Sequence, residues 1–143
     1  MKQVLIPLAL ALGGPAWAQM TPVGVWRSVD DKTGEVKAEI RLAETNGVVS
    51  GRIEKLLRKG ADQTARCHDC DDDRKNQPVI GLEIVRGARK VAGKDIWEGG
   101  KILDPENGRD YALRLTPIEG GTKMEVRGSI AFMGRTQTWV RVP

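Results

Sequence analysis

The two cysteines of the chain stand three positions apart, in the motif Cys67-His68-Asp69-Cys70. In an exported protein such a pair most often forms a local disulfide that stiffens a loop. A redox-active pair would need a cysteine whose thiol pKa is lowered by a helix N-terminus, whereas the acidic flanks of this motif should raise that pKa. Covalent haem attachment would need a histidine directly after the second cysteine, and that position is Asp71.

A metal site is the remaining alternative for this motif. Two thiolates, His68 and a neighbouring aspartate would suit zinc or another thiophilic ion. Oxidising conditions argue against that site because they consume the thiolates. We therefore expect a Cys67–Cys70 disulfide and no metal, and a count of free thiols with and without reductant distinguishes the two.

Other residue types that could do catalytic chemistry are sparse. His68 is the single histidine, and the sequence has no serine nucleophile elbow, no zinc-protease motif and no phosphate-binding glycine loop. Glu98 and Asp104 could act as an acid and base pair inside a barrel that raises a carboxyl pKa. An aspartate before Pro-x-Asn-Gly more often caps a turn, however. We expect no catalytic residue and no cofactor, and we rank an enzyme below two non-catalytic functions.

Residues 1–18 have the order of a secretory signal. Lys2 precedes an apolar stretch over residues 4–12, and Gly-Gly-Pro and then Ala-Trp-Ala follow it. The apolar stretch is too short for a transmembrane anchor, and no cysteine follows at once to carry a lipid. We predict cleavage after Ala18, a single domain over residues 19–143, and a periplasmic or secreted location.

The composition excludes several classes of protein. A chain of 143 residues is one domain's worth, and 17 glycines against four tryptophans, one tyrosine and one phenylalanine favour many tight turns. The formal net charge of +4 is a mild excess. Because the basic residues are interleaved with acidic ones, they predict a solvated face, and we expect no nucleic-acid partner.

Alternation of apolar and charged residues predicts strands. Residues 36–42 alternate in this way, and the Asn46-Gly47 pair that follows indicates a type I′ hairpin. Further strands are predicted over 48–57, 80–85, 95–103, 111–115, 124–130 and 135–142. Residues 58–78, which hold the cysteines, read as a long loop, either the mouth of a site or a decorated connection. Eight or nine strands without a convincing helix predict a closed, antiparallel, up-and-down barrel.

The first and last strands of such a barrel are neighbours. Gly24-Val25-Trp26 opens the first strand, and Trp139-Val140-Arg141 lies in the last. A guanidinium stacked on an indole ring contributes roughly 0.5–2 kcal/mol. This arrangement resembles the lipocalin and wider calycin pattern, in which an arginine of the last strand covers a Gly-x-Trp. The resemblance implies that Trp26, Trp139 and Arg141 close the barrel floor.

Almost all of the predicted mature chain resembles a bacterial exported family known as domain of unknown function 2147. The residues that carry the resemblance are Gly24-Val25-Trp26, Thr33-Gly34, Cys67-x-x-Cys70, residues 78–82, 97–108, Tyr111, 126–128 and 134–141. The family implies a small lipocalin-like barrel with a signal peptide, and it supplies no activity.

A barrel of about eight strands is just wide enough for its side chains or for one small ligand. Our leading hypothesis is a non-catalytic barrel that binds a small apolar or amphipathic, fatty-acid-like molecule, with Arg127 as a possible anchor for an anionic head. The candidate wall residues are Trp97, Tyr111, Leu113, Met124, Val126 and Ile130, which could equally fill a solid core. The second hypothesis is an interaction or envelope-stress module that docks a protein through its outer face or its cysteine loop.

Overall fold

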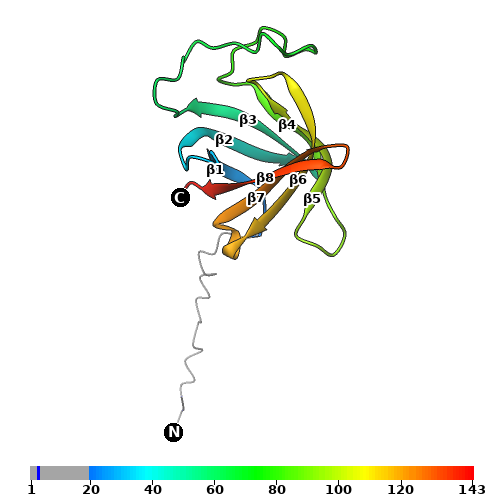
Figure 1. Cartoon of the computed structure of the whole chain (residues 1–143). Helices are drawn as coiled ribbons and strands as arrows, with labels where there is room; N and C mark the ends of the chain where they lie inside the picture. Colours follow the sequence, from blue (N-terminus) through cyan, green and yellow to red (C-terminus); the bar gives the residue numbers. More distant parts are fainter. Residues whose placement is uncertain (1–2, 4–19) are drawn as a thin grey trace.

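Eight strands close into one barrel in the computed structural model, which describes Gln3 and residues 20–143 (Figure 1). The predicted signal over residues 1–18 and its cleavage site therefore lie almost wholly outside the described residues. The strands are β1 Gly24–Val29, β2 Val36–Thr45, β3 Val48–Leu56, β4 Glu83–Lys90, β5 Trp97–Asp104, β6 Arg109–Ile118, β7 Lys123–Ile130 and β8 Met133–Arg141.

The strands pair antiparallel in chain order, and β1 closes the ring by pairing with β8. The predicted all-β, up-and-down barrel is thus confirmed. Alternation explains how the strands bury one face: in β2 Ala38, Ile40 and Leu42 are buried, while Arg41 is exposed. No membrane-spanning helix, long and apolar, occurs in the described part of the chain.

Tight turns join most strands, as the glycine content predicts. Asn46 and Gly47 both have positive φ, at 53° and 80°, which is the conformation that a type I′ hairpin requires. Between β6 and β7 the chain makes a short 3₁₀ turn, Glu119–Gly121. It is the one helical element among residues 20–143.

The connection between β3 and β4 is longer than predicted. The sequence predicts that a strand resumes at Ile80, but β4 begins at Glu83. Gly81, with φ of 91°, bends the backbone there, although its N–H still bonds the carbonyl of Ile53 at 2.7 Å. Residues 57–82, here called the cysteine loop, therefore run outside the barrel wall (Figure 1).

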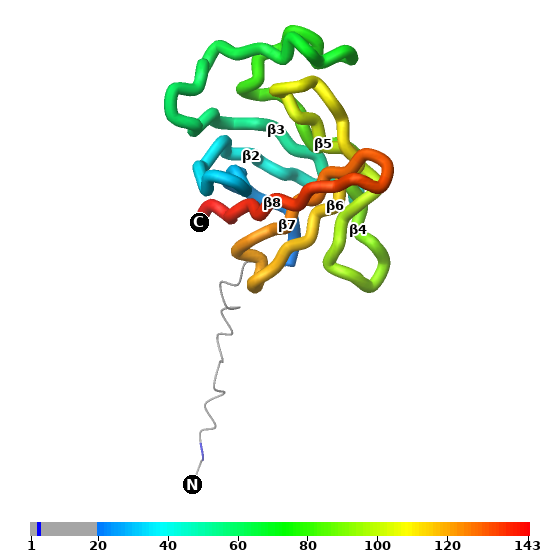
Figure 2. The backbone as a smooth tube through the Cα atoms, in the orientation of Figure 1, coloured from blue at the N-terminus to red at the C-terminus, as the bar shows by residue number. Residues whose placement is uncertain are grey.

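The two ends of the barrel differ. Turns 46–47, 91–96 and 119–122 lie at one end, which we call the floor, and turns 30–35, 105–108 and 131–132 lie at the other with the cysteine loop. Figure 2 follows the chain through this arrangement, with the cysteine loop, in green, rising beyond the strands. The floor half is filled by large buried side chains: Trp26, Leu115, Met124, Trp97 and Leu113.

Candidate ligand-binding cavity

A cavity of about 510 Å³ occupies the half of the barrel away from the floor and opens to solvent there. Its wall is mostly apolar and continues the core upward. The apolar wall residues on the strands are Ala38, Ile40, Ile53, Leu56, Ile84, Ile102, Leu103, Val126 and Trp139. The volume falls in the range of roughly 300–1,000 Å³ typical of small-molecule sites.

The cysteine loop, although it runs outside the ring of strands, supplies part of the cavity wall. Ala61, Ala65 and Val79 line the cavity from the loop, and Val79 donates its backbone N–H to the carbonyl of Ala65 at 2.9 Å. The loop is therefore one side of the mouth, which is the first of the two interpretations that the sequence left open.

The mouth carries polar and charged groups from several elements. Four cations, Lys37, Arg58, Arg66 and Arg135, border it, together with Asp62, Asp104 and Glu106. Ser28, Tyr111 and Gln137 add neutral polar groups. The cavity is thus apolar inside and polar at its opening, which is the polarity profile of an amphipathic molecule.

Two of these cations are held by carboxylates. Arg58 pairs with Glu35 at 2.9 Å and with Asp30 at 3.6 Å, and Arg135 forms a two-pronged ion pair with Asp31. The hydrogen bond from Arg135 is the largest cause that lowers the pKa of Asp31, so this carboxylate stays ionised.

The other two rim cations, Lys37 and Arg66, form no ion pair with any described residue. Arg66 donates only to the backbone carbonyl of Asn76, at 3.0 Å. Lys37 is half-buried at the start of β2. Lys37 and Arg66 are thus the rim cations open to an anionic group, although Asp62, Asp104 and Glu106 at the same mouth also form no ion pair within the described chain.

The floor is closed by a single arginine. The Arg141 guanidinium carbon lies 4.2 Å from the ring centroid of Trp26. Its three nitrogens donate to the carbonyls of Gly121 at 2.7 Å, Val23 at 2.6 Å and Thr21 at 2.6 Å. Burial lowers the pKa of Arg141, and these bonds replace the water that the cation loses.

Trp139 lies between the floor and the cavity. Its side chain is 2% exposed and forms part of the cavity wall. Its indole N–H has no acceptor in the described part of the chain. A buried donor without a partner costs on the order of 1–3 kcal/mol.

The candidate wall residues separate by depth along the strands. Tyr111 and Val126 line the cavity, whereas Trp97, Leu113 and Met124 are buried outside its lining, in the filled half of the barrel. Sequence alternation identifies an inward face but does not tell how deep along the axis each residue lies.

Two other candidates lie away from the cavity. Arg127 is on the outer face of β7, where it donates to Thr136 Oγ1 at 3.2 Å and covers Gly134. Ile130 shares the inward phase of β7 but is 47% exposed, because it lies beyond the rim. The structure therefore does not bring these two residues into the wall with Tyr111 and Val126.

Several wall residues were missed in the sequence. Ala38, Ile40 and Ile53 lie on strands with clear alternation, and this alternation is the signal that identifies them as inward-facing. Ala61 and Ala65 carry no comparable signal, because they belong to a polar loop without periodicity.

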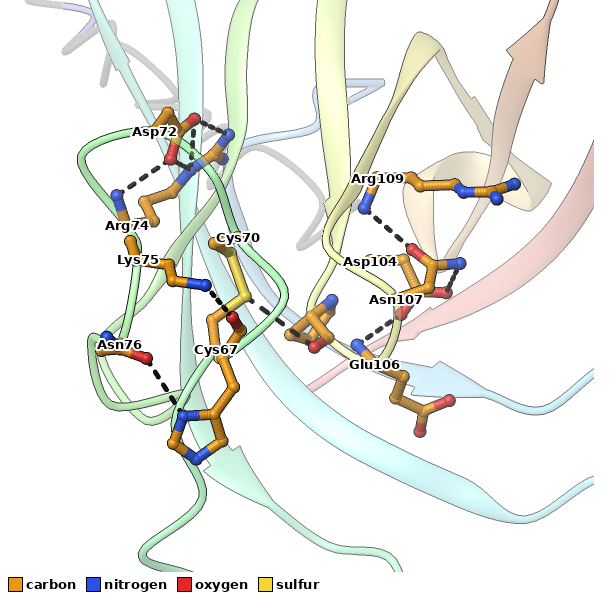
Figure 3. Close-up of a disulfide and its surroundings, with 12 residues drawn as sticks. Cys67, Cys70, Asp72, Arg74, Lys75, Asn76, Asp104, Glu106, Asn107 and Arg109 are labelled. Carbon is orange, nitrogen blue, oxygen red and sulfur yellow. Dashed lines mark hydrogen bonds and ion pairs between the residues drawn. A yellow bond between two sulfur atoms is a disulfide. The ribbon is translucent and has the colours of Figure 1, made fainter.

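The disulfide between Cys67 and Cys70 is present, as predicted, and both cysteines are buried. Figure 3 shows the pair against the β5–β6 turn, where the Cys67 sulfur lies 3.8 Å from the Pro105 carbonyl oxygen. His68 is exposed and contacts Asn76 at 3.1 Å. Among residues 20–143, no three His, Cys, Asp or Glu side chains gather closely enough to hold a metal ion.

A buried arginine fixes the loop to the barrel wall. Arg74 is 4% exposed and bonds Asp72 at 2.6 Å, Asp110 of β6 at 3.1 Å and the Glu83 carbonyl of β4 at 2.9 Å. The hydrogen bonds from Arg74 lower the pKa of Asp72 to about 2. Arg86 adds an exposed pair with Asp73 at 2.9 Å.

Asp104 and Glu98, the carboxylates considered for acid and base roles, are used locally. Asp104 accepts from the backbone N–H of Glu106 at 2.9 Å and so caps the turn after β5. Glu98 pairs on the outer surface with Arg114 at 3.1 Å.

Comparisons with known proteins agree with this architecture. The family model described as "Uncharacterized protein conserved in bacteria (DUF2147)" matches residues 24–141. Among solved structures, the fold is similar to protein HP1028 from the human pathogen Helicobacter pylori, which is described as belonging to the lipocalin family. The TM-score is 0.71 at 19% identity, over 85% of this chain and 82% of that one. No curated protein matches the chain.

Proposed function

The chain belongs to the DUF2147 family of bacterial proteins, and from its lipocalin-like barrel we propose that it binds one amphipathic molecule with an anionic head, without catalysis. The observation that carries the proposal is the open cavity of about 510 Å³. In a solid barrel, the inward side chains of eight strands would fill this space. The cavity favours ligand binding over an interaction module with a filled core.

The apolar tail would lie among the aliphatic wall residues. Ile40, Ile53 and Val126 present branched side chains from three different strands. Since removing apolar surface from water contributes roughly 25 cal/mol per Å², an apolar tail supplies most of the affinity.

The head group would lie at the mouth, beside Lys37 and Arg66. Because neither cation is engaged in an ion pair within the described chain, a carboxylate, sulfate or phosphate would gain a charge-assisted partner without breaking an existing one. Tyr111 adds a neutral hydroxyl to the same lining. The proposed location is the periplasm, and this part of the proposal rests on the sequence of residues 1–18 alone.

A fluorescence titration tests the proposal. Trp139 in the wall reports occupancy, and a panel of fatty acids, with alcohols and amines of the same chain length, separates tail from head recognition. We expect saturable quenching, with acids bound more tightly than alcohols and alcohols more tightly than amines. Absence of saturable binding across the panel, checked by native mass spectrometry, would refute the proposal.

Matched variants test the site itself. Ala38→Phe adds bulk inside the cavity, whereas Ala112→Phe adds the same bulk at an exposed position on β6. We expect only Ala38→Phe to weaken binding, while both variants keep the far-ultraviolet spectrum of the barrel. Lys37→Gln should reduce the preference for acids over alcohols and leave the affinity for alcohols unchanged.

A further inference from the structure

The β7–β8 hairpin ends in an apolar tip, formed by Ile130, Ala131, Phe132 and Met133. Phe132 is 94% exposed and Met133 is 71% exposed, the two highest values among the large apolar side chains of the described chain. Soluble surfaces carry scattered apolar residues, but four in succession at a protruding turn form a patch.

This tip stands at the mouth of the cavity. In the hairpin, Gly128 pairs with Arg135, and Ile130 pairs with Met133. Gly128 and Arg135 line the cavity. Because alternate residues of a strand share a face, Ile130 and Met133 continue the cavity-facing side one step beyond the rim. Because the strands alternate in direction, the hairpin and the cysteine loop both belong to the end of the barrel opposite the floor.

Within the hairpin itself both charged side chains are basic, although Arg135 is paired with Asp31 of the β1–β2 turn. Residues 126–137 read VRGSIAFMGRTQ, with two arginines and no acidic residue. Arg127 is exposed on the outer face, and its hydrogen bond is to the Thr136 hydroxyl. The neighbouring mouth carries both signs of charge, with Lys37 and Arg66 among the cations and Asp62, Asp104 and Glu106 as the carboxylates. Arg127, which forms no ion pair within the described chain, therefore gives the outer side of the tip a positive charge that complements an anionic surface.

The size and shape of the tip fit a lipid surface better than a protein partner. A stable protein interface buries roughly 800 Å² on each side, and four side chains of which one is aromatic cover about half of that. Insertion of a few apolar and aromatic side chains beneath a headgroup layer needs no complementary pocket.

We propose that this tip inserts into the headgroup region of an anionic phospholipid bilayer and turns the cavity mouth toward the membrane. Docking itself does not depend on the ligand. The exchange of an amphipathic molecule between bilayer and cavity rests on the function proposed above.

Flotation with phospholipid vesicles tests docking. We expect binding to phosphatidylcholine vesicles that contain phosphatidylglycerol, and weaker binding to phosphatidylcholine alone or at high salt. Phe132→Ser with Met133→Ser should lower the partition coefficient at least about tenfold, from the lost burial of two apolar side chains. Met20→Ser, a change of an exposed methionine beyond the floor, is the control and should have no effect.

A second variant keeps the apolar bulk and reports its depth. Phe132→Trp should bind vesicles as well as the unchanged protein, and lipids brominated along their acyl chains should quench it more than they quench the unchanged protein. Equal vesicle binding by the serine variant, no vesicle binding by the unchanged protein, or a dimer abolished by the serine substitutions would each overturn the proposal.

Ligand titrations without vesicles separate this proposal from the function of the cavity. The serine variant should bind a soluble fatty acid as the unchanged protein does. If no ligand binds but vesicles still do, the cavity proposal fails and docking stands. If ligand binds but vesicles do not, docking fails alone.

Discussion

Gly108, in the β5–β6 turn, lies with its α-carbon directly against the backbone carbonyl of Asp69 in the cysteine loop, so no side chain fits between them. Gly108 also has φ of +71°, which L-residues other than glycine rarely adopt. The contact holds the disulfide against the β5–β6 turn, whose Pro105 and Glu106 line the cavity.

Gly108→Ala should therefore destabilise the protein by about 2 kcal/mol or more, from backbone strain and from overlap with the carbonyl. Urea unfolding measures this. Gly93→Ala is the matched control, since Gly93 has φ of +72° but no neighbouring atom within 4 Å, and it should cost only about 1 kcal/mol. Equal losses would mean that the contact with Asp69 contributes nothing.

Acid should weaken the Asp72–Arg74 ion pair, which helps to hold the cysteine loop on the barrel. The pKa of Asp72 is lowered to about 2 by Arg74, from a usual value of 3.8. A carboxyl with a lowered pKa stabilises the fold above its unfolded pKa and loses that contribution as the pH falls through its folded pKa. The loss should therefore occur between about pH 4 and pH 2.

The size of this contribution is on the order of 1 kcal/mol, because the Asp72 side chain is 37% exposed and solvent screens the pair. Asp72→Asn should be less stable than the unchanged protein at pH 7 and should approach it at pH 2. Urea unfolding across this range is the measurement, and a difference that stays constant with pH would contradict the assignment.

The stability of the barrel floor should depend on the positive charge of Arg141 and on the three hydrogen bonds that its guanidinium donates. Arg141→Met leaves three carbonyls without their partner and removes the cation from Trp26, so we expect a loss of about 2–4 kcal/mol. Arg141→Lys should recover only part of it, because one ammonium cannot reproduce the planar arrangement.

An exposed arginine on β2 supplies the comparison for the floor. Arg41 pairs with Glu54 at 2.8 Å, but its side chain is 59% exposed. Arg41→Met should cost about 0.5 kcal/mol or less. If Arg141→Met and Arg41→Met lowered the stability measured by thermal unfolding by similar amounts, the proposed structural role of Arg141 at the floor would be contradicted.

Trp139 is a buried residue whose substitution we expect to cost little stability. Trp139→Phe removes a buried indole N–H that has no acceptor in the described chain, which offsets the lost packing volume. We expect thermal stability to change by less than about 1 kcal/mol, and ligand-dependent quenching to fall sharply. Quenching that persists unchanged would locate the bound molecule near another tryptophan.

The barrel could be predicted from the sequence because its signals are local. The alternation through Ala38 and Ile40 and the turn at Asn46-Gly47 each depend on neighbours in the chain. The neighbourhood of Trp26 and Arg141 followed from closure of the ring, which makes the first and last strands adjacent.

The cavity could be predicted only in part because it depends on depth and on a loop. Met124 and Val126 are both apolar and both point inward from β7. Met124 nevertheless lies in the filled floor half, whereas Val126 lines the cavity. Ile130, in phase with them, lies beyond the rim. The register of eight strands sets these depths, and no single strand's pattern contains that information.

The seam between β1 and β8 has a consequence for the order of events during biosynthesis. Arg141 bonds Val23 across 118 positions of sequence. Chains are synthesised at roughly 5–20 residues per second. β8, the second neighbour of β1, is therefore completed on the order of ten seconds after β1. Until then the nascent chain exposes two unpaired strand edges and the indole of Trp26. A holding chaperone therefore has a long interval in which to capture the unclosed chain.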